Sequence, residues 1–491
     1  MSLTRLAPST ELAARARTAL HRVDLSLPVR LAVDDALIVP GGTTFLDYGC
    51  GRGGDVDRLR RMGVRCAGWD PTHRPRGKRP ASDVVNLGYV VNVIEDPIER
   101  AATLRRAWEL TCAVLVVSAR LASEARDLEG APCGDGVCTS TGTFQRLYGQ
   151  SELRAWIEQV LGAETVAAAP GVFLAFRYPE LEQDWLLRRV RRTRRLAPVS
   201  KELIEQNEAA LEPLLTFVGE RGRLPRAGEL AEDESVAISD RFGTLRNAFA
   251  VVRRVTGTER WDRIRDFRSQ DLLVFLALSR FERRARPKDL PDDVRYDIRD
   301  LFGSHAAACR QADRLLAELA NQDRVREAAI ASSVGKRLPS AHYVHADSVG
   351  RLPPILRVMD GAARRLIGHV GESTIVKLHL DRPAVSYLSY PDFDSDPHPS
   401  LAGGYLVALD RLRCEYRDYS GHSNPPILHR KELLLAKDDP RHHRFAAMTR
   451  QEVRAGLYEW RSSIGTRRAW AGLLEERGLR YRGHRLVAVK G

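Results

Sequence analysis

Short hydrophobic runs that end at a polar residue alternate with amphipathic stretches along the first 180 residues. One run, Thr44 to Leu46, ends at Asp47, and a hydrophobic period of three to four residues begins at Val56. A second run, Val64 to Trp69, ends at Asp70. Strands that alternate with helices in this way predict parallel βαβ units, and therefore an α/β fold for this part of the chain.

A glycine-rich turn joins the first predicted strand to the helix that follows it. Glycines occupy four of the six positions from Gly49 to Gly54. Such a turn adopts backbone angles that side chains forbid, and it lets a ligand approach bare backbone at a helix N-terminus. Asp70 lies twenty-one residues after Gly49, about where a nucleotide-binding βαβ unit places the carboxylate that holds a ribose. The pattern predicts a site for a nucleoside cofactor.

The identity of that cofactor depends on Asp47. Gly49, Gly51 and Gly54 also satisfy the GxGxxG pattern of NAD-binding proteins, so an NAD-dependent oxidoreductase is an alternative. A carboxylate at the strand end, however, suits a cationic ligand and repels a pyrophosphate. S-adenosylmethionine carries a sulfonium and an ammonium group, and we expect it to bind at Asp47, Gly49, Gly51 and Asp70. The segment DYGCGRG also resembles the D/E-x-G-x-G-x-G signature of class I methyltransferases.

That resemblance implies a Rossmann-like sheet of strand order 3-2-1-4-5-7-6. Further strands are predicted at 83–87, 113–119, 165–169 and 171–178, which close a methyltransferase domain over residues 1–180. Only twelve residues separate Asp70 from Asp83, so we expect the third strand to be missing or reduced to a loop. The glycine-rich segment 134–142 is expected to be a loop, and Ser26 to Val39 to flank the cofactor mouth.

Residues just past the fourth strand are candidates for contact with the methyl acceptor. The carboxyl ends of strands in an open α/β sheet face the ligand crevice, which is where we expect Asn86, Leu87, Tyr89 and Asn92. DNA amino-methyltransferases have Asn/Asp-Pro-Pro-Tyr at this point, whereas Asn86-Leu87-Gly88-Tyr89 lacks both prolines. The likeness implies that Asn86 orients an amine, Tyr89 stacks on the acceptor and Leu87 lies at the cofactor. In the alternative, Asn86 bonds its own loop and Tyr89 packs.

The middle of the chain, residues 181–330, is predicted to be a basic helical domain. The net charge is +13 and the pI is near 9.6, which favours a nucleic-acid partner, although heavy use of arginine throughout the chain weakens that inference. Six arginines fall within eight positions and are expected to form either a phosphate-binding ridge or a solvated linker helix: Arg188, Arg189, Arg191, Arg192, Arg194 and Arg195.

The last region, residues 331–491, is predicted to be an α+β domain rich in histidine and aspartate. Ten of the thirteen histidines follow residue 340, and 373–380 and 384–390 read as paired strands. The alternatives are a metal or phosphodiester site, with a metal-dependent nuclease activity, and an aspartate-rich loop with structural histidines. The residues concerned are His342, His345, His379, His398, His422, His429, Asp392, Asp394 and Asp396.

The cellular location is predicted from cysteine use and hydropathy. The seven cysteines are odd in number, scattered and without a CxxC pair, which fits a reducing compartment. The N-terminus lacks the apolar core of a signal peptide, and no run approaches the length of a membrane span. We expect a cytoplasmic protein without a membrane partner.

Several segments together resemble the DNA phosphorothioation-associated putative methyltransferases. They are DYGCGRGGD with GWDP, VVNLGYVVNVIEDPIER, LVVSARL, DLLVFLALSRF, KLHLDRPAVSYLSYPDFDSDPHPSL and NPPILHRKE. The likeness extends from about Arg17 to Tyr458. It implies a bacterial S-adenosylmethionine-dependent methyltransferase linked to the proteins that place sulfur in the DNA backbone for self-marking and defence, with DNA as the favoured substrate. A nucleic-acid-binding defence component whose cofactor site is a sensor or a relic is the alternative.

Overall fold

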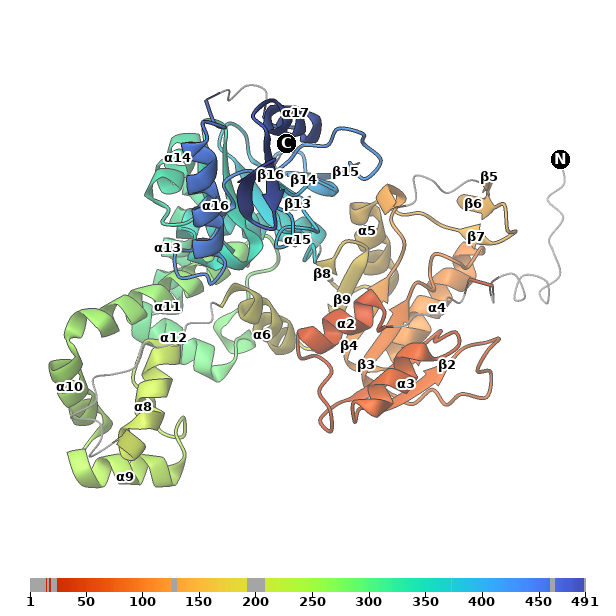
Figure 1. Ribbon diagram of the computed structural model, residues 1–491. Helices are drawn as coiled ribbons and strands as arrows, with labels where there is room; N and C mark the ends of the chain where they lie inside the picture. The colour runs from red at the N-terminus through yellow and green to blue at the C-terminus, as the bar shows by residue number, and fades with distance from the viewer. Residues whose placement is uncertain are drawn as a thin grey trace. The chain divides into compact units, whose positions relative to one another are not determined.

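A computed structural model describes most of the chain, namely residues 15, 17–18, 24–124, 130–191, 208–371, 373–459 and 464–489 (Figure 1). The chain divides into two compact units. The first comprises residues 1–181, 334–346 and 362–491, and the second comprises residues 182–333 and 347–361. None of the described helices is both long enough and apolar enough to cross a membrane.

The first unit begins with a six-stranded sheet of order β2-β1-β3-β4-β9-β8. Its strands are parallel except for β9, which is antiparallel to both of its neighbours. This is the expected class I methyltransferase order without strand 3, and residues 70–81 between β2 and β3 contain no helix or strand. The strands are β1 (Thr44–Tyr48), β2 (Arg65–Trp69), β3 (Ser82–Gly88), β4 (Thr111–Ser118), β8 (Val166–Ala169) and β9 (Val172–Phe176).

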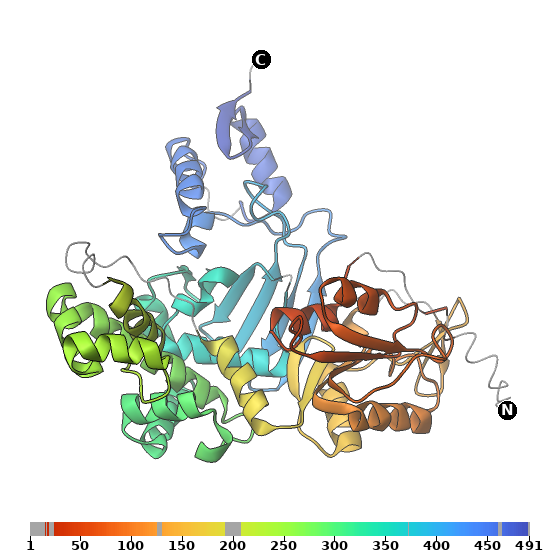
Figure 2. The same ribbon diagram turned by 90° about the horizontal axis from the view of Figure 1, so that it is seen from below.

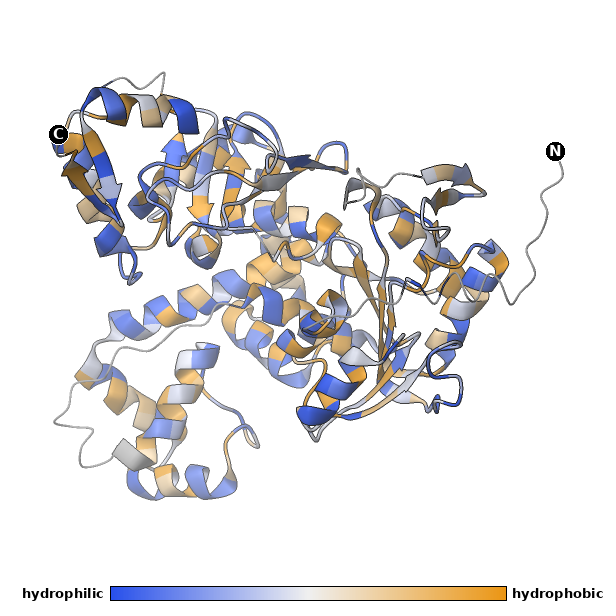
Figure 3. Cartoon of the chain, turned by 45° about the vertical axis from the view of Figure 1, so that its right-hand side comes forward, coloured by the Kyte–Doolittle hydropathy of each residue, from blue (hydrophilic) through white to orange (hydrophobic). Residues whose placement is uncertain are grey.

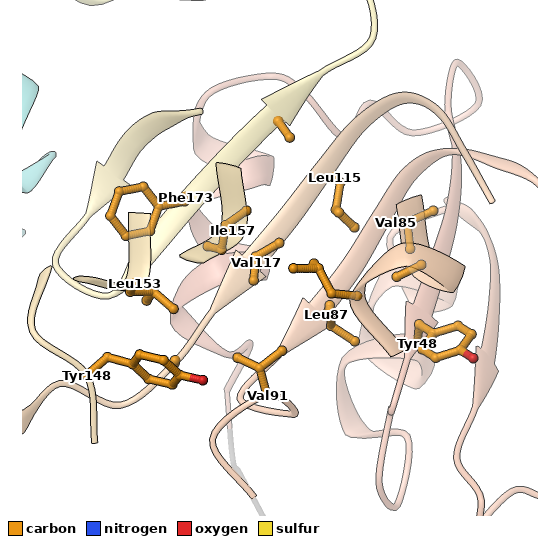
Figure 4. Packing of buried hydrophobic residues seen from close by; sticks show 14 of the residues in the cluster. Tyr48, Val85, Leu87, Val91, Leu115, Val117, Tyr148, Leu153, Ile157 and Phe173 are labelled. Atoms are coloured by element: carbon orange, nitrogen blue, oxygen red, sulfur yellow. The ribbon is translucent and has the colours of Figure 1, made fainter. Parts of the chain in front are cut away.

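Among the described residues, four helices accompany this sheet: α2 (Leu27–Asp34), α3 (Gly54–Arg61), α4 (Pro97–Glu109) and α5 (Gln150–Leu161). Pro97 is the first residue of α4, and the Asp96 carboxylate accepts a hydrogen bond from the Ile98 amide, so the sequence itself fixes where this helix begins. Side chains of α4, α5 and the central strands form one buried hydrophobic cluster (Figure 4). That cluster fixes the carboxyl ends of β1, β3 and β4 relative to one another.

The prediction of a glycine-rich loop at 134–142 was wrong. The segment contributes to a small antiparallel sheet of β5 (Gly130–Cys133), β6 (Gly136–Thr139) and β7 (Phe144–Gln145). Gly134 has a φ of 57° and turns the chain between β5 and β6. The glycines therefore serve a tight hairpin.

The remainder of the first unit contains a second six-stranded sheet, which is antiparallel throughout. The strand pair predicted at 373–380 and 384–390 is confirmed as β12 and β13. The strands are β10 (Lys336–Leu338), β11 (Ala341–His345), β12 (Ile375–His379), β13 (Ala384–Ser389), β14 (Gly403–Ala408) and β15 (Arg413–Asp418). Helices α16 (His442–Arg454) and α17 (Arg467–Glu476) and a hairpin of β16 (Leu479–Arg482) and β17 (Arg485–Ala488) follow.

The second unit is helical, as predicted, and its helices carry hydrophilic residues between hydrophobic ones (Figure 3). The segment from Asp271 to Leu278 is buried at almost every position in the second half of α11. Residues 179–190 and 354–367, in α6 and α15, extend across a boundary between the units. The helices are α6 (Pro179–Val190), α8 (Glu208–Arg221), α9 (Glu232–Phe242), α10 (Leu245–Thr256), α11 (Thr258–Leu278), α12 (Asp292–Phe302), α13 (His305–Glu318), α14 (Gln322–Ala331) and α15 (Pro354–Ile367).

Short 3-10 helices connect several of these elements. Within the described residues they are η1 (Ala122–Glu124), η2 (Pro287–Asp289), η3 (Ala346–Arg351) and η4 (Lys431–Leu434).

Candidate functional site

A cavity of about 510 Å³ opens at the carboxyl ends of β1, β2 and β3. Pockets of a few hundred to about 1,000 Å³ hold cofactors and drug-sized ligands, so this volume suits a nucleoside. The cavity is lined by six of the eight residues for which the sequence predicts a cofactor or acceptor role, namely Asp47, Gly49, Gly51, Asp70, Asn86 and Tyr89. Three segments that are distant in sequence therefore meet here.

The glycine turn forms the part of the cavity wall between β1 and α3. Gly49 has a φ of 96°, and a Cβ atom added to it would lie 2.4 Å from Cγ2 of Val90. Glycine is therefore required at this position for backbone conformation and for space. Gly53, with a φ of 83°, is the N-cap of α3 and provides no side chain to cap it. The first amides of α3 are consequently left for a polar ligand group.

Four hydrogen bonds orient the Asp70 carboxylate, one from the glycine turn and three from the residues that follow Asp70. Its Oδ2 atom accepts from the Gly51 amide at 3.1 Å. Its Oδ1 atom accepts from the Thr72 and His73 amides at 2.9 Å and 2.8 Å and contacts the His73 ring at 3.2 Å. Because each carboxylate oxygen can accept about two hydrogen bonds, Oδ2 retains capacity for a ligand hydroxyl. The carboxylate is thus oriented before any ligand arrives.

Asp47 and Asn86 form a buried polar pair on neighbouring strands. Their side chains are only 4% and 3% exposed, and the Asn86 amide donates to Oδ1 of Asp47 at 2.8 Å. The pair exists because Asp47 on β1 is in register with Asn86 on β3. Among the described residues, Oδ1 of Asn86 has no hydrogen-bond partner although it is buried. A buried acceptor without a partner is costly unless a ligand completes it.

Tyr89 adopts an unusual backbone conformation directly after β3. Its φ is 58°, in the left-handed region that bulky residues rarely occupy. The amide of Tyr89 donates to the backbone oxygen of Ser118 at 2.9 Å and lies 3.1 Å from the Ser118 hydroxyl, which holds the conformation in place. Strained residues of this kind cluster at functional sites.

Leu87 and Asn92 lie apart from the cavity, contrary to expectation. The Leu87 side chain is fully buried in the hydrophobic cluster with Val91 and Val117, because successive side chains of a strand point to opposite faces of the sheet (Figure 4). Asn86 faces the cavity, so Leu87 cannot. The Asn92 amide donates to Gln145 at 2.9 Å and helps to fix β7.

Cys50 also lines the cavity, although its type gave no signal of a role in the sequence. Burial raises the pKa of the Cys50 thiol to about 12, and the negative charge of Asp47 adds to the shift. The thiol therefore stays protonated near neutral pH and is a poor nucleophile.

Other parts of the cavity wall come from segments that the sequence pattern did not connect with the site. Helix α4 contributes Glu99, Thr103 and Arg106. Arg15 and Ser26 line the opening from the N-terminal side, and Arg15 bonds to Glu99 at 2.7 Å. Ser26 begins the segment that was expected to flank the cofactor mouth. Only the three-dimensional fold brings α4 to this position, so spacing could not reveal it.

The arginine-rich segment, which spans the last turn of α6 and the residues that follow it, is only partly described. Arg192, Arg194 and Arg195 lie outside the described residues. Arg188 pairs with Asp184, the Arg189 guanidinium stacks over a tryptophan ring at 4.1 Å, and Arg191 donates to a backbone oxygen at 3.1 Å. Each of the three described arginines thus has a partner within the chain.

The described histidines of the last region do not form one cluster, although the ring centroids of His398 and His429 lie 4.6 Å apart and both rings pack against Trp470. His342 contacts the Val334 backbone oxygen, and His379 contacts Ser386, at 2.9 Å and 3.0 Å. His398 contacts Glu452 at 2.9 Å, and His429 contacts a backbone oxygen at 2.7 Å. In the part of the chain that the structure describes, no three His, Cys, Asp or Glu side chains are placed to hold a metal ion. A metal-dependent nuclease therefore has no ligand set among these residues.

Comparisons with known proteins match solved structures of methyltransferases. No protein-family model matches the chain, and no curated protein matches it. The matching structures include a 1,6-didemethyltoxoflavin-N1-methyltransferase of Burkholderia thailandensis with bound S-adenosylhomocysteine (15% identity, 36% of this chain, 92% of that chain, TM-score 0.26). Another is the sugar N-methyltransferase KedS8 of Streptoalloteichus sp. ATCC 53650 (16% identity, 35% of this chain, 89% of that chain, TM-score 0.24). A third is the S-adenosylmethionine-bound amino pentose methyltransferase CalS10 of Micromonospora echinaspora (16% identity, 36% of this chain, 100% of that chain, TM-score 0.25).

At these identities and TM-scores the matches carry no argument about substrate. The strand order of the first sheet defines its class: this part of the chain has the class I methyltransferase fold, followed by a helical region and an antiparallel β region.

Proposed function

We propose that this protein is an S-adenosylmethionine-dependent methyltransferase that acts on nucleic acid, with DNA favoured, in association with DNA phosphorothioation. The buried pair of Asp47 and Asn86 carries the proposal. The Asn86 side-chain nitrogen lies 2.8 Å from Oδ1 of Asp47, on the wall of a nucleoside-sized cavity. The Asn86 side-chain oxygen has no hydrogen-bond donor among the described residues. A cationic cofactor and an amine both suit such a site, whereas a pyrophosphate does not.

The cavity residues divide the work of holding the cofactor. Asp47 offsets the positive charge of the sulfonium and ammonium groups. The free capacity of Asp70 Oδ2 suits a ribose hydroxyl, and the uncapped N-terminus of α3 suits the carboxylate of the methionine part. No separate base is needed for these contacts. The same set offers NAD the ribose contact and the N-terminus of α3, but the Asp47 carboxylate opposes its phosphates.

The chemistry asks mainly for alignment. When bound, the cofactor supplies a methyl group whose bond to sulfur breaks as an acceptor lone pair bonds to the carbon, and the electron pair stays on sulfur. Asn86 Oδ1 accepts a hydrogen from the acceptor amine and so directs the amine lone pair, and Tyr89 bounds the same space. Alignment of this kind accounts for large rate factors without an acid or base. A neutral amine loses its proton to water after transfer.

The nucleic-acid substrate rests on charge and on resemblance. A net charge of +13 favours a polyanion through counterion release. The association with phosphorothioation rests on the family resemblance of the segments quoted above. An exocyclic amine of a base is the acceptor that fits Asn86.

Calorimetric titration of the full chain tests the cofactor. We expect S-adenosylhomocysteine to bind and NAD not to bind, and we expect Asp47→Ala to weaken binding at least tenfold. Asp34→Ala removes an exposed carboxylate outside the cavity and is the matched control. Equal affinity of Asp47→Ala and wild type, or binding of NAD alone, would overturn the proposal. Radiolabelled methyl transfer to DNA with and without phosphorothioate then tests the acceptor, and loss of transfer in Asn86→Ala tests its role.

A further inference from the structure

The C-terminal end of the first unit carries a compact basic module, residues 464–489, which consists of α17 and the β16–β17 hairpin (Figure 2). It holds six arginines and two glutamates, and no lysine or aspartate. Positive charge is therefore denser here than in the chain as a whole. The function proposed above makes no use of this module.

One face of the module packs against the rest of the first unit. Trp470 of α17 is buried with Ile427 and Leu457, and Leu479, Tyr481 and Leu486 of the hairpin pack on this cluster. The Tyr481 hydroxyl donates to the buried Glu452 carboxylate at 2.7 Å. These contacts fix α17 relative to the hairpin and leave the opposite faces of both in solvent.

The outward face of α17 is built for close approach. Arg467, Arg468, Ala471 and Gly472 are exposed over the first turns of α17, and Glu475 and Glu476 are exposed on the same face at its last turn. A glycine inside a helix is unfavourable relative to alanine. Gly472 has an ordinary helical backbone, and a Cβ atom added to it would meet nothing within 4 Å. The fold of this chain gives no reason for the glycine, but a molecule lying against the helix gives one.

The outward face of the hairpin also carries exposed arginines. Arg480, Arg482 and Arg485 lie on this face, and Arg482 pairs directly opposite Arg485. Like charges directly opposite each other on paired strands destabilise a sheet. The repulsion between the two arginines therefore lowers the stability of the free protein, and an anion that bound both side chains would offset it.

Most of these charges are also available. Arg467 is partly engaged, since it donates to Ser400 at 2.9 Å and lies 3.8 Å from the Asp396 carboxylate. For Arg468, Arg477, Arg480, Arg482 and Arg485, no ion pair exists among the described residues. Arg188, Arg189 and Arg191, by contrast, all have intramolecular partners.

We infer that the module binds double-stranded DNA, with the first turns of α17, from Arg467 to Gly472, in the major groove and the hairpin arginines on the phosphates. The major groove of B-form DNA, about 12 Å wide, admits a helix, whereas the deep, narrow major groove of A-form RNA does not. Ala471 and Gly472 let the helix backbone approach the base edges, with Arg467 and Arg468 on the turn before them and Glu475 and Glu476 on the turn after them. Binding at this module does not require the cofactor site.

Fluorescence anisotropy of the full chain with a labelled duplex of about 25 base pairs, a little over two helical turns, tests the inference. No cofactor is added, so the result is separate from that of the cofactor titration. We expect Arg480→Glu/Arg482→Glu/Arg485→Glu to weaken binding at least tenfold and to lower the slope of log K against log salt by up to about 0.9 for each phosphate that is no longer neutralised. Arg299→Glu/Arg310→Glu/Arg314→Glu changes three exposed arginines of α12 and α13 and is the control of equal charge.

A second variant separates shape from charge. Gly472→Ala fills only open space and should melt no lower than wild type. Gly472→Leu should also fold, yet we expect it to weaken duplex binding at least fivefold because its side chain holds the helix away from the groove. Equal duplex affinity of the hairpin variant and its control, unchanged affinity of Gly472→Leu, or tighter binding of an RNA duplex of the same sequence would each overturn the inference.

Discussion

Replacement of Asn86 by aspartate converts the buried amide–carboxylate pair into two carboxylates. With the present separation of 2.8 Å and an effective dielectric constant of about 20, two unit charges repel by about 6 kcal/mol. One of the two groups will therefore keep a proton, with a pKa about 4 units above the usual value near 4. A raised pKa in the folded state means that stability is complete below about pH 4 and is lost as the pH rises toward about 8.

Thermal unfolding at several pH values measures this effect. Between pH 5 and pH 8 we expect Asn86→Asp to lose about 4 kcal/mol relative to wild type, which corresponds to a fall of about 10 °C in melting temperature for a domain of this size. At about pH 4 the protonated aspartate can donate to Asp47 as the amide does, so the variant should resemble wild type there.

Asn92→Asp is the matched control for this experiment. Asn92 is equally buried but bonds to the Gln145 side-chain amide at 2.9 Å, and that amide can turn to donate to a carboxylate. The stability of Asn92→Asp should therefore depend less on pH than that of Asn86→Asp. If Asn86→Asp melts with wild type at pH 8, or if both variants respond equally to pH, then Asp47 is not a charged partner of Asn86 and the electrostatic argument for a cationic cofactor fails.

Three further predictions concern other parts of the molecule. Gly49→Ala should abolish S-adenosylhomocysteine binding in calorimetry, because its Cβ would lie 2.4 Å from Val90, and Val90→Ala should restore part of the affinity; no restoration would refute the steric cause. Lys431 is fully buried, and burial is the main reason why its pKa falls to about 7, so its charged form is disfavoured; stability should rise from about pH 7 toward pH 10 in wild type but not in Lys431→Met, as measured by urea unfolding. The Arg223 side chain is fully buried against Asp297 at 2.6 Å, so Arg223→Met should lower the stability of the helical region by about 3–5 kcal/mol, and a change below about 1 kcal/mol in urea unfolding would contradict the pairing.

The sequence was sufficient for the first sheet because its signals are local. Each strand is a short hydrophobic run bounded by turn residues, and the missing third strand follows from the twelve residues between Asp70 and Asp83. The hairpin of β5 and β6 was missed because its signal is not local. Glycines such as Gly134 and Gly136 read as a loop, because the strand partners that need them are visible only in the pairing.

The site was predictable where strand geometry fixes it and not elsewhere. Asp47 and Asn86 were expected near the cofactor because both end parallel strands, and the structure places them in one register. The prediction that Leu87 lies at the cofactor was wrong because adjacent residues of a strand face opposite sides of the sheet. The likeness of residues 86–89 to Asn/Asp-Pro-Pro-Tyr did not take this into account. Arg15 and Thr103 could not be found, since nothing in their spacing links them to the glycine turn.

The net charge of the chain does not show which of its arginines are available to a partner. Composition indicated an anionic partner, and the densest run of arginines in the sequence was the natural candidate for binding it. In the described part of that run, however, Arg188 and Arg191 are engaged within the chain. Arginine density in sequence does not distinguish charge that stabilises the fold from charge that remains for a partner. Arg482 opposite Arg485 does make that distinction, because a like-charged pair weakens the free hairpin and gains only when an anion binds. Unfavourable local arrangements, more than favourable ones, are therefore the guide to the surface on which we propose that this protein binds a polyanion.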